Sequence, residues 1–392
     1  MYKSIFRPLL FHLDAEDIHN KIVKYLQIYR HLTPVRKIVS SSCHTETAGW
    51  KWRNLTFRNR VGLSAGFDKA ASCFDELSDL GFGFIEVGTV TPKEVKGNPC
   101  PRIFRLPKEQ ALISRTGFNN PGKAVFLQNL KRKRFGKYIL GININTNHPD
   151  NQEQAMTDIL DLYCTFNNYA DYYTINWGSI APDILGPILI TLFQHKQEYK
   201  KPVFLKLPAD LTFEKAEEII RFAIQHHIDG FIACGPTQDR SLLTRSTPTE
   251  INNIGAGGIS GLPVLQKSLK TVKYLSEHAP KDMLIIGAGG IITSQDAQAM
   301  LDAGAHLVQI YSAFIYEGPY VVKRIAKVCK NERTIRLKRT HDQAQTNARS
   351  GSNERTIRLK RTHDPAASSS TLRRDRIVVY SSVSAKSVQT SA

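Results

Sequence analysis

LIIGAGGI (residues 284–291) and AHLVQIYS (residues 305–312) are the two runs of this sequence that decide its fold. Each is strand-like and ends in small or hydroxyl residues, Ala288-Gly289-Gly290 in the first and Tyr311-Ser312 in the second. Glycines let backbone N–H groups approach an anion, and a following helix N-terminus adds its positive end. The pair therefore predicts a phosphate site, with two tight strand-to-helix turns as the alternative. Their place as the last two strands of a β/α series favours phosphate, because barrel enzymes commonly hold one there.

The strand pattern extends through most of the chain. Apolar runs predict eight strands, at 61–67, 84–90, 138–144, 172–178, 203–208, 230–235, 284–290 and 307–312. Helical patterns fill the gaps, for instance Phe213 to His227 after Thr212 and Ser294 to Ala303 after Thr293. Eight parallel β/α units predict an α/β TIM barrel whose chemistry lies at the C-terminal strand ends, and a doubly wound open sheet is the alternative.

Composition sets limits on the class of protein. The 392 residues are 41% hydrophobic, which is enough for one large barrel plus extensions. The formal net charge is +18, and residues from Asn331 onward hold 13 Lys and Arg against 5 Asp and Glu, so this segment carries +8 of it. The residues before Asn331 are also basic overall, which indicates anionic ligands or an anionic membrane surface.

Six scattered cysteines without a C-x-x-C pair argue against a zinc site or a disulfide framework. We expect no metal and a reducing cytoplasm. The longest apolar run, ILGPILITLF at 184–193, is too short for a transmembrane helix and is broken by Gly186 and Pro187. The first residues do not resemble a signal peptide.

Residues 1–40 predict two short amphipathic helices. Ile5, Leu9, Leu10 and Leu13 share one face, and Ile18, Ile22, Val23, Leu26 and Tyr29 share another after Asp14, a candidate N-cap. Basic residues lie among them. Such helices either lie in a bilayer interface or pack on the main domain, and the pattern leaves both possibilities open.

The predicted strand ends carry reactive side chains. The first ends Ala65-Gly66-Phe67-Asp68-Lys69, the second has Thr89, the third Asn143, the fourth Asn176 with Ser179 beyond it, and the fifth Lys206. A lysine inside an apolar strand is costly unless it is paired or functional, so Lys206 is the stronger candidate. Lys69 follows Asp68 and could be half of a surface ion pair. Two lysines at one mouth can hold an anion and stabilise an electron-rich ring.

From Met1 to about Cys329 the chain resembles the class 2, quinone-dependent dihydroorotate dehydrogenases. The matching segments are VGLSAGFDK, GFGFIEVGTVTPKEVKGNPCPRIFRL, TGFNN, GIN, GGISGLPV, IIGAGGI and LVQIYSAFIYEGP. The resemblance implies a TIM barrel that holds FMN and oxidises dihydroorotate to orotate in pyrimidine biosynthesis. It also implies N-terminal helices that form a quinone tunnel, with the enzyme peripheral at the cytoplasmic face of a bacterial inner membrane.

The resemblance also implies roles for individual residues. Ser179 would be the catalytic base. Substrate would contact Lys69, Asn176 and the segment Arg115, Thr116, Gly117 and Phe118. The FMN-contacting residues would be Ala65, Gly66, Lys69, Thr89, Asn143, Asn176, Lys206, Gly261, Gly290, Tyr311 and Ser312.

The substrate half of the motif departs from the family. Three of the four substrate-binding asparagine positions read Ser114, Ala181 and Gly235, and Asn176 alone is kept. Each lost amide removes about two hydrogen bonds, which can cost on the order of 1–3 kcal/mol. A flavin barrel with an altered substrate or little activity is therefore the alternative function.

The last segment is of a different kind. NERTIRLKRTHD occurs at 331–342 and again at 353–364, followed by a Ser- and Ala-rich stretch. We divide the chain into an N-terminal extension at 1–45, a barrel at 46–330 and a disordered tail at 331–392. A basic scaffold that binds nucleic acid or membrane is a third reading, but the arginines lack interleaved aromatics and we expect no nucleic-acid partner.

Overall fold

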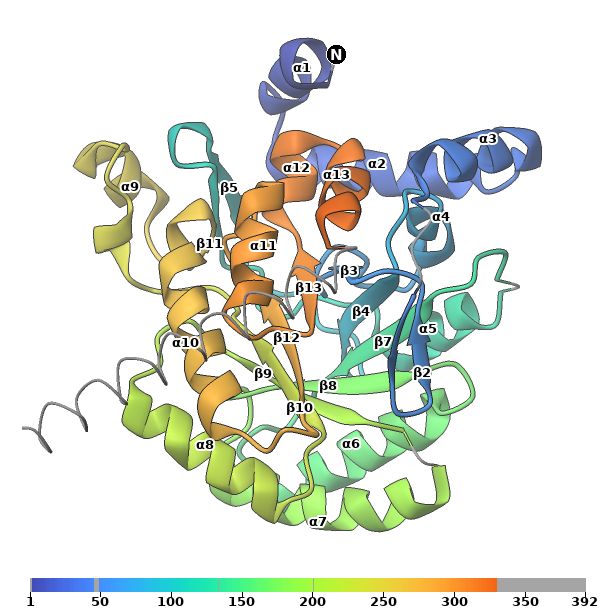
Figure 1. Ribbon diagram of the computed structural model, residues 1–392, viewed down its shortest axis with the longest axis vertical. Helices are drawn as coiled ribbons and strands as arrows, with labels where there is room; N and C mark the ends of the chain where they lie inside the picture. The colour runs from blue at the N-terminus through green and yellow to red at the C-terminus, as the bar shows by residue number, and fades with distance from the viewer. Residues whose placement is uncertain (1, 46–48, 133, 200, 330–392) are drawn as a thin grey trace, which may run out of the picture. The chain divides into compact units, whose positions relative to one another are not determined.

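The computed structural model describes residues 2–45, 49–132, 134–199 and 201–329, in which eight parallel strands form a closed barrel (Figure 1). In spatial order they are β10 (Gly230–Ala233), β12 (Leu284–Ala288), β13 (Leu307–Ile310), β3 (Val61–Leu63), β4 (Phe84–Val90), β7 (Ile139–Ile144), β8 (Tyr172–Asn176) and β9 (Val203–Leu207). Closure comes from β13 pairing with β3, with Val308 opposite Val61. The barrel prediction is confirmed, and the open sheet is excluded.

All eight predicted strands are present, but six end earlier than predicted. The ladder stops where the backbone turns away from the barrel into the loops, and these loops carry the candidate site residues. The helices packed around the strands are α4 (Phe74–Ser78), α5 (Gly122–Leu130), α6 (Gln152–Phe166), α7 (Pro182–Tyr199), α8 (Phe213–Gln225), α10 (Leu265–His278), α11 (Ser294–Asp302), α12 (Ser312–Glu317) and α13 (Tyr320–Val328). Both predicted helix starts are confirmed, because the side chains of Thr212 and Thr293 cap α8 and α11.

The N-terminal end of the barrel is closed by a hairpin that the strand pattern did not predict. Its strands are β1 (Trp50–Trp52) and β2 (Leu55–Phe57), and Leu55 and Phe57 join the buried residues at the beginnings of the barrel strands. Inside this end, glycines make room for rings on neighbouring strands. A Cβ on Gly62 would lie 2.3 Å from the Phe84 ring, and one on Gly141 would lie 2.1 Å from the Tyr172 ring.

A second sheet, also unpredicted, borders the C-terminal mouth. It contains β5 (Ile103–Leu106), β6 (Ala111–Ser114) and β11 (Gly258–Gly261), with β6 antiparallel to both neighbours. The loop that leads to β11 adds α9 (Pro248–Ile254), which is seen at the upper left in Figure 1. Three 3-10 turns, at Pro107–Glu109, Arg240–Leu242 and Leu262–Val264, complete these loops.

The N-terminal segment is helical, as predicted. It contains a π-helical turn (Tyr2–Phe6), α1 (Arg7–Phe11), α2 (Ala15–Tyr29) and α3 (Thr33–Cys43), and Asp14 caps α2 through bonds from the Glu16 and Asp17 amides. These helices lie together with α12 and α13 at the top of Figure 1. The predicted tail at 331–392 lies outside the described residues, and the domain boundaries stay a prediction.

Buried ion pairs attach this segment to the barrel. On α3, Arg36 is 4% exposed and donates to Asp75 at 2.9 Å and to Asp79 at 2.6 Å, both at the α4 helix. Arg30, next to the end of α2, pairs with Glu76 on α4. The helices are therefore fixed to the barrel through charges as well as apolar contacts.

Candidate active site

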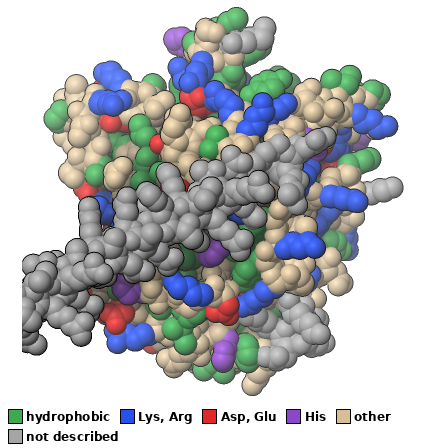
Figure 2. Space-filling model, viewed as in Figure 1, with side chains coloured by type: hydrophobic (Ala, Val, Ile, Leu, Met, Phe, Trp, Pro, Cys, Tyr) green, Lys and Arg blue, Asp and Glu red, His purple; other side chains and the backbone are tan. Residues whose placement is uncertain are grey.

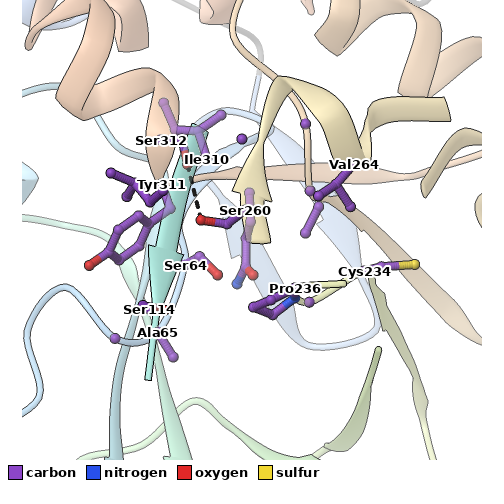
Figure 3. A pocket seen from close by; sticks show the side chains of 18 of the residues that line it. Ser64, Ala65, Ser114, Cys234, Pro236, Ser260, Val264, Ile310, Tyr311 and Ser312 are labelled. Atoms are coloured by element: carbon purple, nitrogen blue, oxygen red, sulfur yellow. Dashed lines mark hydrogen bonds between the residues drawn. The ribbon is translucent and has the colours of Figure 1, made fainter. Parts of the chain in front are cut away.

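Two cavities open at the C-terminal ends of the barrel strands. The first has a volume of about 190 Å³ and lies between β3, β12, β13 and the β5–β6–β11 sheet (Figure 3). The second, of about 330 Å³, lies over β4, β7, β8 and β9. Lys69 and Lys206 line both cavities, as do Ala65, Gly66 and Thr116. Both lysines chosen from the sequence therefore lie where the two cavities meet.

Lys206 is held from below by a buried carboxylate. Its Nζ donates to Ser64 Oγ at 2.9 Å and to Glu86 Oε1 at 3.2 Å, and Glu86 is fully buried. Sequence reasoning missed Glu86. The available signal was the same one that identified Lys206, a charged residue within an apolar strand.

Thr89, Asn143 and Asn176 form one hydrogen-bonded group across β4, β7 and β8. The two amides bond to each other, Asn176 Nδ2 donating at 3.1 Å and Asn143 Nδ2 at 3.2 Å. Thr89 Oγ1 donates to Asn143 Oδ1 at 2.7 Å. All three line the larger cavity, so polar groups are fixed along one wall.

Glycines and hydroxyls surround the far end of the smaller cavity. Gly290 has a φ of +86°, and a Cβ there would lie 2.3 Å from the Leu265 backbone, so only glycine fits. Gly261 has a φ of +101° and is equally close to Gln110. Ser312 Oγ donates to Ser260 Oγ at 3.5 Å, the dashed line in Figure 3. This end has the backbone and hydroxyl donors that suit an anion.

The predicted substrate segment is only partly at the cavities. Thr116 lines both cavities, Phe118 lines the larger one, and Lys69 Nζ donates to Asn119 Oδ1. Arg115 instead donates to backbone carbonyls, among them Ala256 at 2.9 Å, and Gly117 lies against Asn98. Burial lowers the pKa of Lys69 to about 8.

Ser179 does not line either cavity. Its hydroxyl donates to the carbonyl of Asn176 at 2.7 Å and to Asn145 Oδ1 at 3.4 Å. Of the family's replaced asparagine positions, Ser114 lines the smaller cavity, Gly235 lines both cavities, and Ala181 is exposed. Trp177, beside Asn176, also lines the larger cavity, and its ring packs edge-on against Phe222 with ring centroids 5.0 Å apart.

A third cavity, of about 160 Å³, lies between the N-terminal helices and the barrel. Leu10, Ile18 and Phe67 are among its mostly apolar lining residues, and it shares Tyr311, Ile103 and Leu112 with the smaller mouth cavity. Burial lowers the pKa of His19 to about 4 and raises that of Tyr311 to about 12. His19 and Tyr311 are therefore uncharged at neutral pH, and because most of the lining is apolar, with Arg105 as its cation, the cavity suits a largely apolar ligand.

The N-terminal helices bury few side chains and leave many large apolar ones exposed. Ile18, Arg36 and Cys43 are buried, whereas the large apolar side chains at 43–67% exposure are Ile5, Phe6, Leu9, Leu13, Tyr25, Ile28, Leu32, Val35 and Ile38. Figure 2 shows Lys and Arg side chains around the upper part of the molecule, where these helices lie. The helices pack on the barrel, as one reading of the pattern predicts, and they also present an apolar surface, so the bilayer-interface reading stays a prediction. Among the described residues, no helix has the length and apolar character to cross a bilayer.

Comparison with known proteins agrees with this geometry. The family model for dihydroorotate dehydrogenase matches residues 48–332. Curated relatives named dihydroorotate dehydrogenase (quinone) include that of Christiangramia forsetii, 38% identical over 83% of this chain and 97% of its own, and that of Chromobacterium violaceum, 40% identical over 83% and 97%.

Solved structures give the same result. The ligand-free DHODH of Eimeria tenella is 30% identical and covers 80% of this chain and 93% of its own, with a TM-score of 0.68. The ferulenol complex of DHODH from the same organism has a TM-score of 0.63.

Proposed function

The chain belongs to the dihydroorotate dehydrogenase family, and on that basis we propose that it oxidises dihydroorotate to orotate in pyrimidine biosynthesis, with FMN as cofactor and a membrane quinone as electron acceptor. One observation carries the proposal. The two mouth cavities share Lys69 and Lys206, and the smaller one shares Tyr311 with the apolar cavity under the N-terminal helices. One ring in the smaller cavity would then reach a polar substrate on one side and an apolar acceptor on the other.

The residues present fit FMN. A phosphate would fit against the backbone at Gly261 and Gly290, both of which have a positive φ. The hydroxyls of Ser260 and Ser312 add side-chain donors beside it. Gln309 also lines this cavity, and its Oε1 has no hydrogen-bond partner among the described residues, which leaves an acceptor for a ligand donor. We assign FMN contacts to Ala65, Gly66, Lys69, Thr89, Asn143, Asn176, Lys206, Gly261, Gly290, Tyr311 and Ser312. When bound, FMN supplies an acceptor for two electrons.

The larger cavity, where the flavin would reach Thr89, Asn143 and Asn176, is also our candidate for the substrate. Lys69 provides positive charge for a carboxylate, Thr116 and Phe118 close one side, and the Asn143–Asn176 pair offers amides to a planar ring. Ser179 stays the candidate base, and this role requires the loop after Asn176 to move. In this loop, nothing lies within 4 Å of a Cβ built on Gly178, the residue before Ser179.

The apolar cavity is our candidate for the quinone. Its walls come from both the N-terminal helices and the barrel. We place the exposed apolar residues of these helices in the interface of a bacterial inner membrane, on its cytoplasmic face, with basic side chains at the headgroups. The enzyme is then peripheral and draws quinone from the bilayer.

The test is turnover by purified protein with dihydroorotate and a soluble quinone analogue, together with an absorption spectrum. We expect a flavin spectrum and quinone-dependent formation of orotate. Colourless protein that gains no flavin signal when FMN is added would contradict the proposal.

The names of the relatives do not favour the alternative of another substrate. The absent asparagines still predict weak substrate binding. Restoring asparagine together at Ser114, Ala181 and Gly235 should raise kcat/KM for dihydroorotate by at least about tenfold, since one amide corresponds to roughly 1–3 kcal/mol. Room exists at position 235, where a Cβ would lie 3.5 Å from Leu207 O. An unchanged or lower kcat/KM would show that this chain binds substrate through other groups.

A further inference from the structure

Glu86 lies inside the barrel directly beneath the candidate site. It is on β4, two residues after Phe84 and on the same face, and no part of it is exposed. Its Oε1 accepts from Lys206 Nζ at 3.2 Å and from Asn143 Nδ2 at 3.3 Å. Its Oε2 accepts from Gln309 Nε2 at 2.8 Å and from Tyr172 OH at 3.4 Å. Four other strands therefore orient one carboxylate.

Lys206 is the one cation paired with this carboxylate among the described residues. The other three partners are neutral amide and phenol donors. A buried carboxylate without a counter-charge is strongly unfavourable, so Glu86 and Lys206 stabilise each other in the interior. Their opposite charges also partly cancel at any point above them.

Lys206 stands between Glu86 and the mouth. Its side chain is 12% exposed and lines both cavities, whereas Glu86 lines neither. A ring bound in the mouth would therefore meet the ammonium first and the carboxylate behind it. The field at the ring is that of the pair and not that of a free lysine.

We propose that Glu86 is a positioning residue that fixes the Lys206 ammonium at the floor of the cavities and reduces the positive potential that Lys206 delivers to the flavin. This inference rests on the proposed function, because it takes the flavin as the bound ring. Glu86 would thereby set the balance between the oxidised and reduced forms of the cofactor without touching it.

The test is Glu86→Gln, which keeps the shape and an acceptor for Lys206 but removes the negative charge. The purified flavoprotein would be titrated spectroelectrochemically, following flavin absorbance. Electron uptake adds negative charge, so an unscreened Lys206 should favour the reduced form. We expect at least a tenfold rise in the ratio of reduced to oxidised flavin at fixed potential, which is about 30 mV for a two-electron couple.

Tyr172→Phe is the matched control, because it removes a hydrogen bond to the same carboxylate without changing charge. We expect it to change the ratio by less than about twofold while lowering the unfolding temperature, as loss of one buried hydrogen bond should. Equal shifts in Glu86→Gln and Tyr172→Phe, or no shift in Glu86→Gln, would overturn the inference.

A second pair of variants covers the case in which Glu86→Gln does not fold. Lys206→Met leaves the carboxylate unpaired, and Lys206→Met with Glu86→Gln leaves no buried charge. The double variant should hold its flavin at the more positive potential, and equal potentials would overturn the inference. Wild-type protein that takes up no flavin would instead overturn the proposed function, and this inference with it.

Discussion

Raising the pH from about 7 to about 9 should weaken the binding of orotate to the wild-type chain, and Lys69→Arg should remove this dependence. Lys69 lines both mouth cavities and donates to Asn119. Burial lowers the pKa of Lys69 to about 8, with Glu16 opposing the change and Arg102 adding to it. Because the pKa is lowered, the ammonium is lost as the pH rises through about 8, and the carboxylate of the ligand then loses its cation.

The size of the effect follows from the titration. With a pKa of about 8, the ammonium fraction is about nine tenths near pH 7 and about one tenth near pH 9. If orotate binds the charged form, its Kd should rise roughly tenfold over this interval, which is about 1.4 kcal/mol. An arginine stays protonated throughout, so Lys69→Arg should lack this component. Lys69→Met should bind weakly at both pH values.

Trp177 provides the assay, because this residue lines the larger cavity and its fluorescence should respond to a ligand there. Orotate would be titrated against wild type and both variants at each pH. The change in the Kd of Lys69→Arg with pH corrects for ionisation of the ligand and of other side chains. If the Kd of the wild type changed with pH as little as that of Lys69→Arg, the assignment of Lys69 as the titrating cation would be refuted.

Three further changes test the site, the membrane contact and the helix anchor. Lys206→Ala should lose flavin or slow its reduction, measured by absorbance and stopped flow, far more than the exposed Lys131→Ala; equal behaviour would make Lys206 purely structural. Ile38 is 67% exposed, and Ile38→Asp should weaken the free energy of vesicle binding, measured by co-sedimentation, by roughly 1–2 kcal/mol. Truncation from Asn331 should leave vesicle binding unchanged. The reverse pattern would place the membrane contact in the tail. Arg36→Met leaves buried carboxylates uncompensated and should lower the free energy of unfolding in urea by roughly 3–5 kcal/mol; a loss below about 1 kcal/mol would mean that apolar packing alone attaches α3.

The barrel was predictable because each β/α unit carries a local signal. A buried parallel strand is a short apolar run, and a capped helix follows it, as at Thr212 and Thr293. The β5–β6–β11 sheet lacks such a signal, because Ser114 pairs with Gly258 far along the chain and each strand has only four residues.

The candidate site was likewise predictable from the sequence only in part. Strand-end residues such as Lys206 and Asn143 were found because the fold places all strand ends at one mouth. Loop residues were not placed by this rule, since Ser179 lies outside the cavities and Arg115 bonds to backbone carbonyls. Glu86 was visible as a charge in an apolar strand, but its partner Lys206 is 120 residues away.

The close fit at the base of the barrel restricts the order in which this sequence can change. A side chain at position 62 would overlap the Phe84 ring, and one at 141 would overlap the Tyr172 ring. An interior packed at crystal density cannot absorb such overlap by a small shift. A substitution at Gly62 or Gly141 is therefore accessible only after the facing ring has been replaced by a smaller residue. In a lineage that varies one position at a time, each pair has one permitted order of replacement, and the first step leaves a cavity that the second fills.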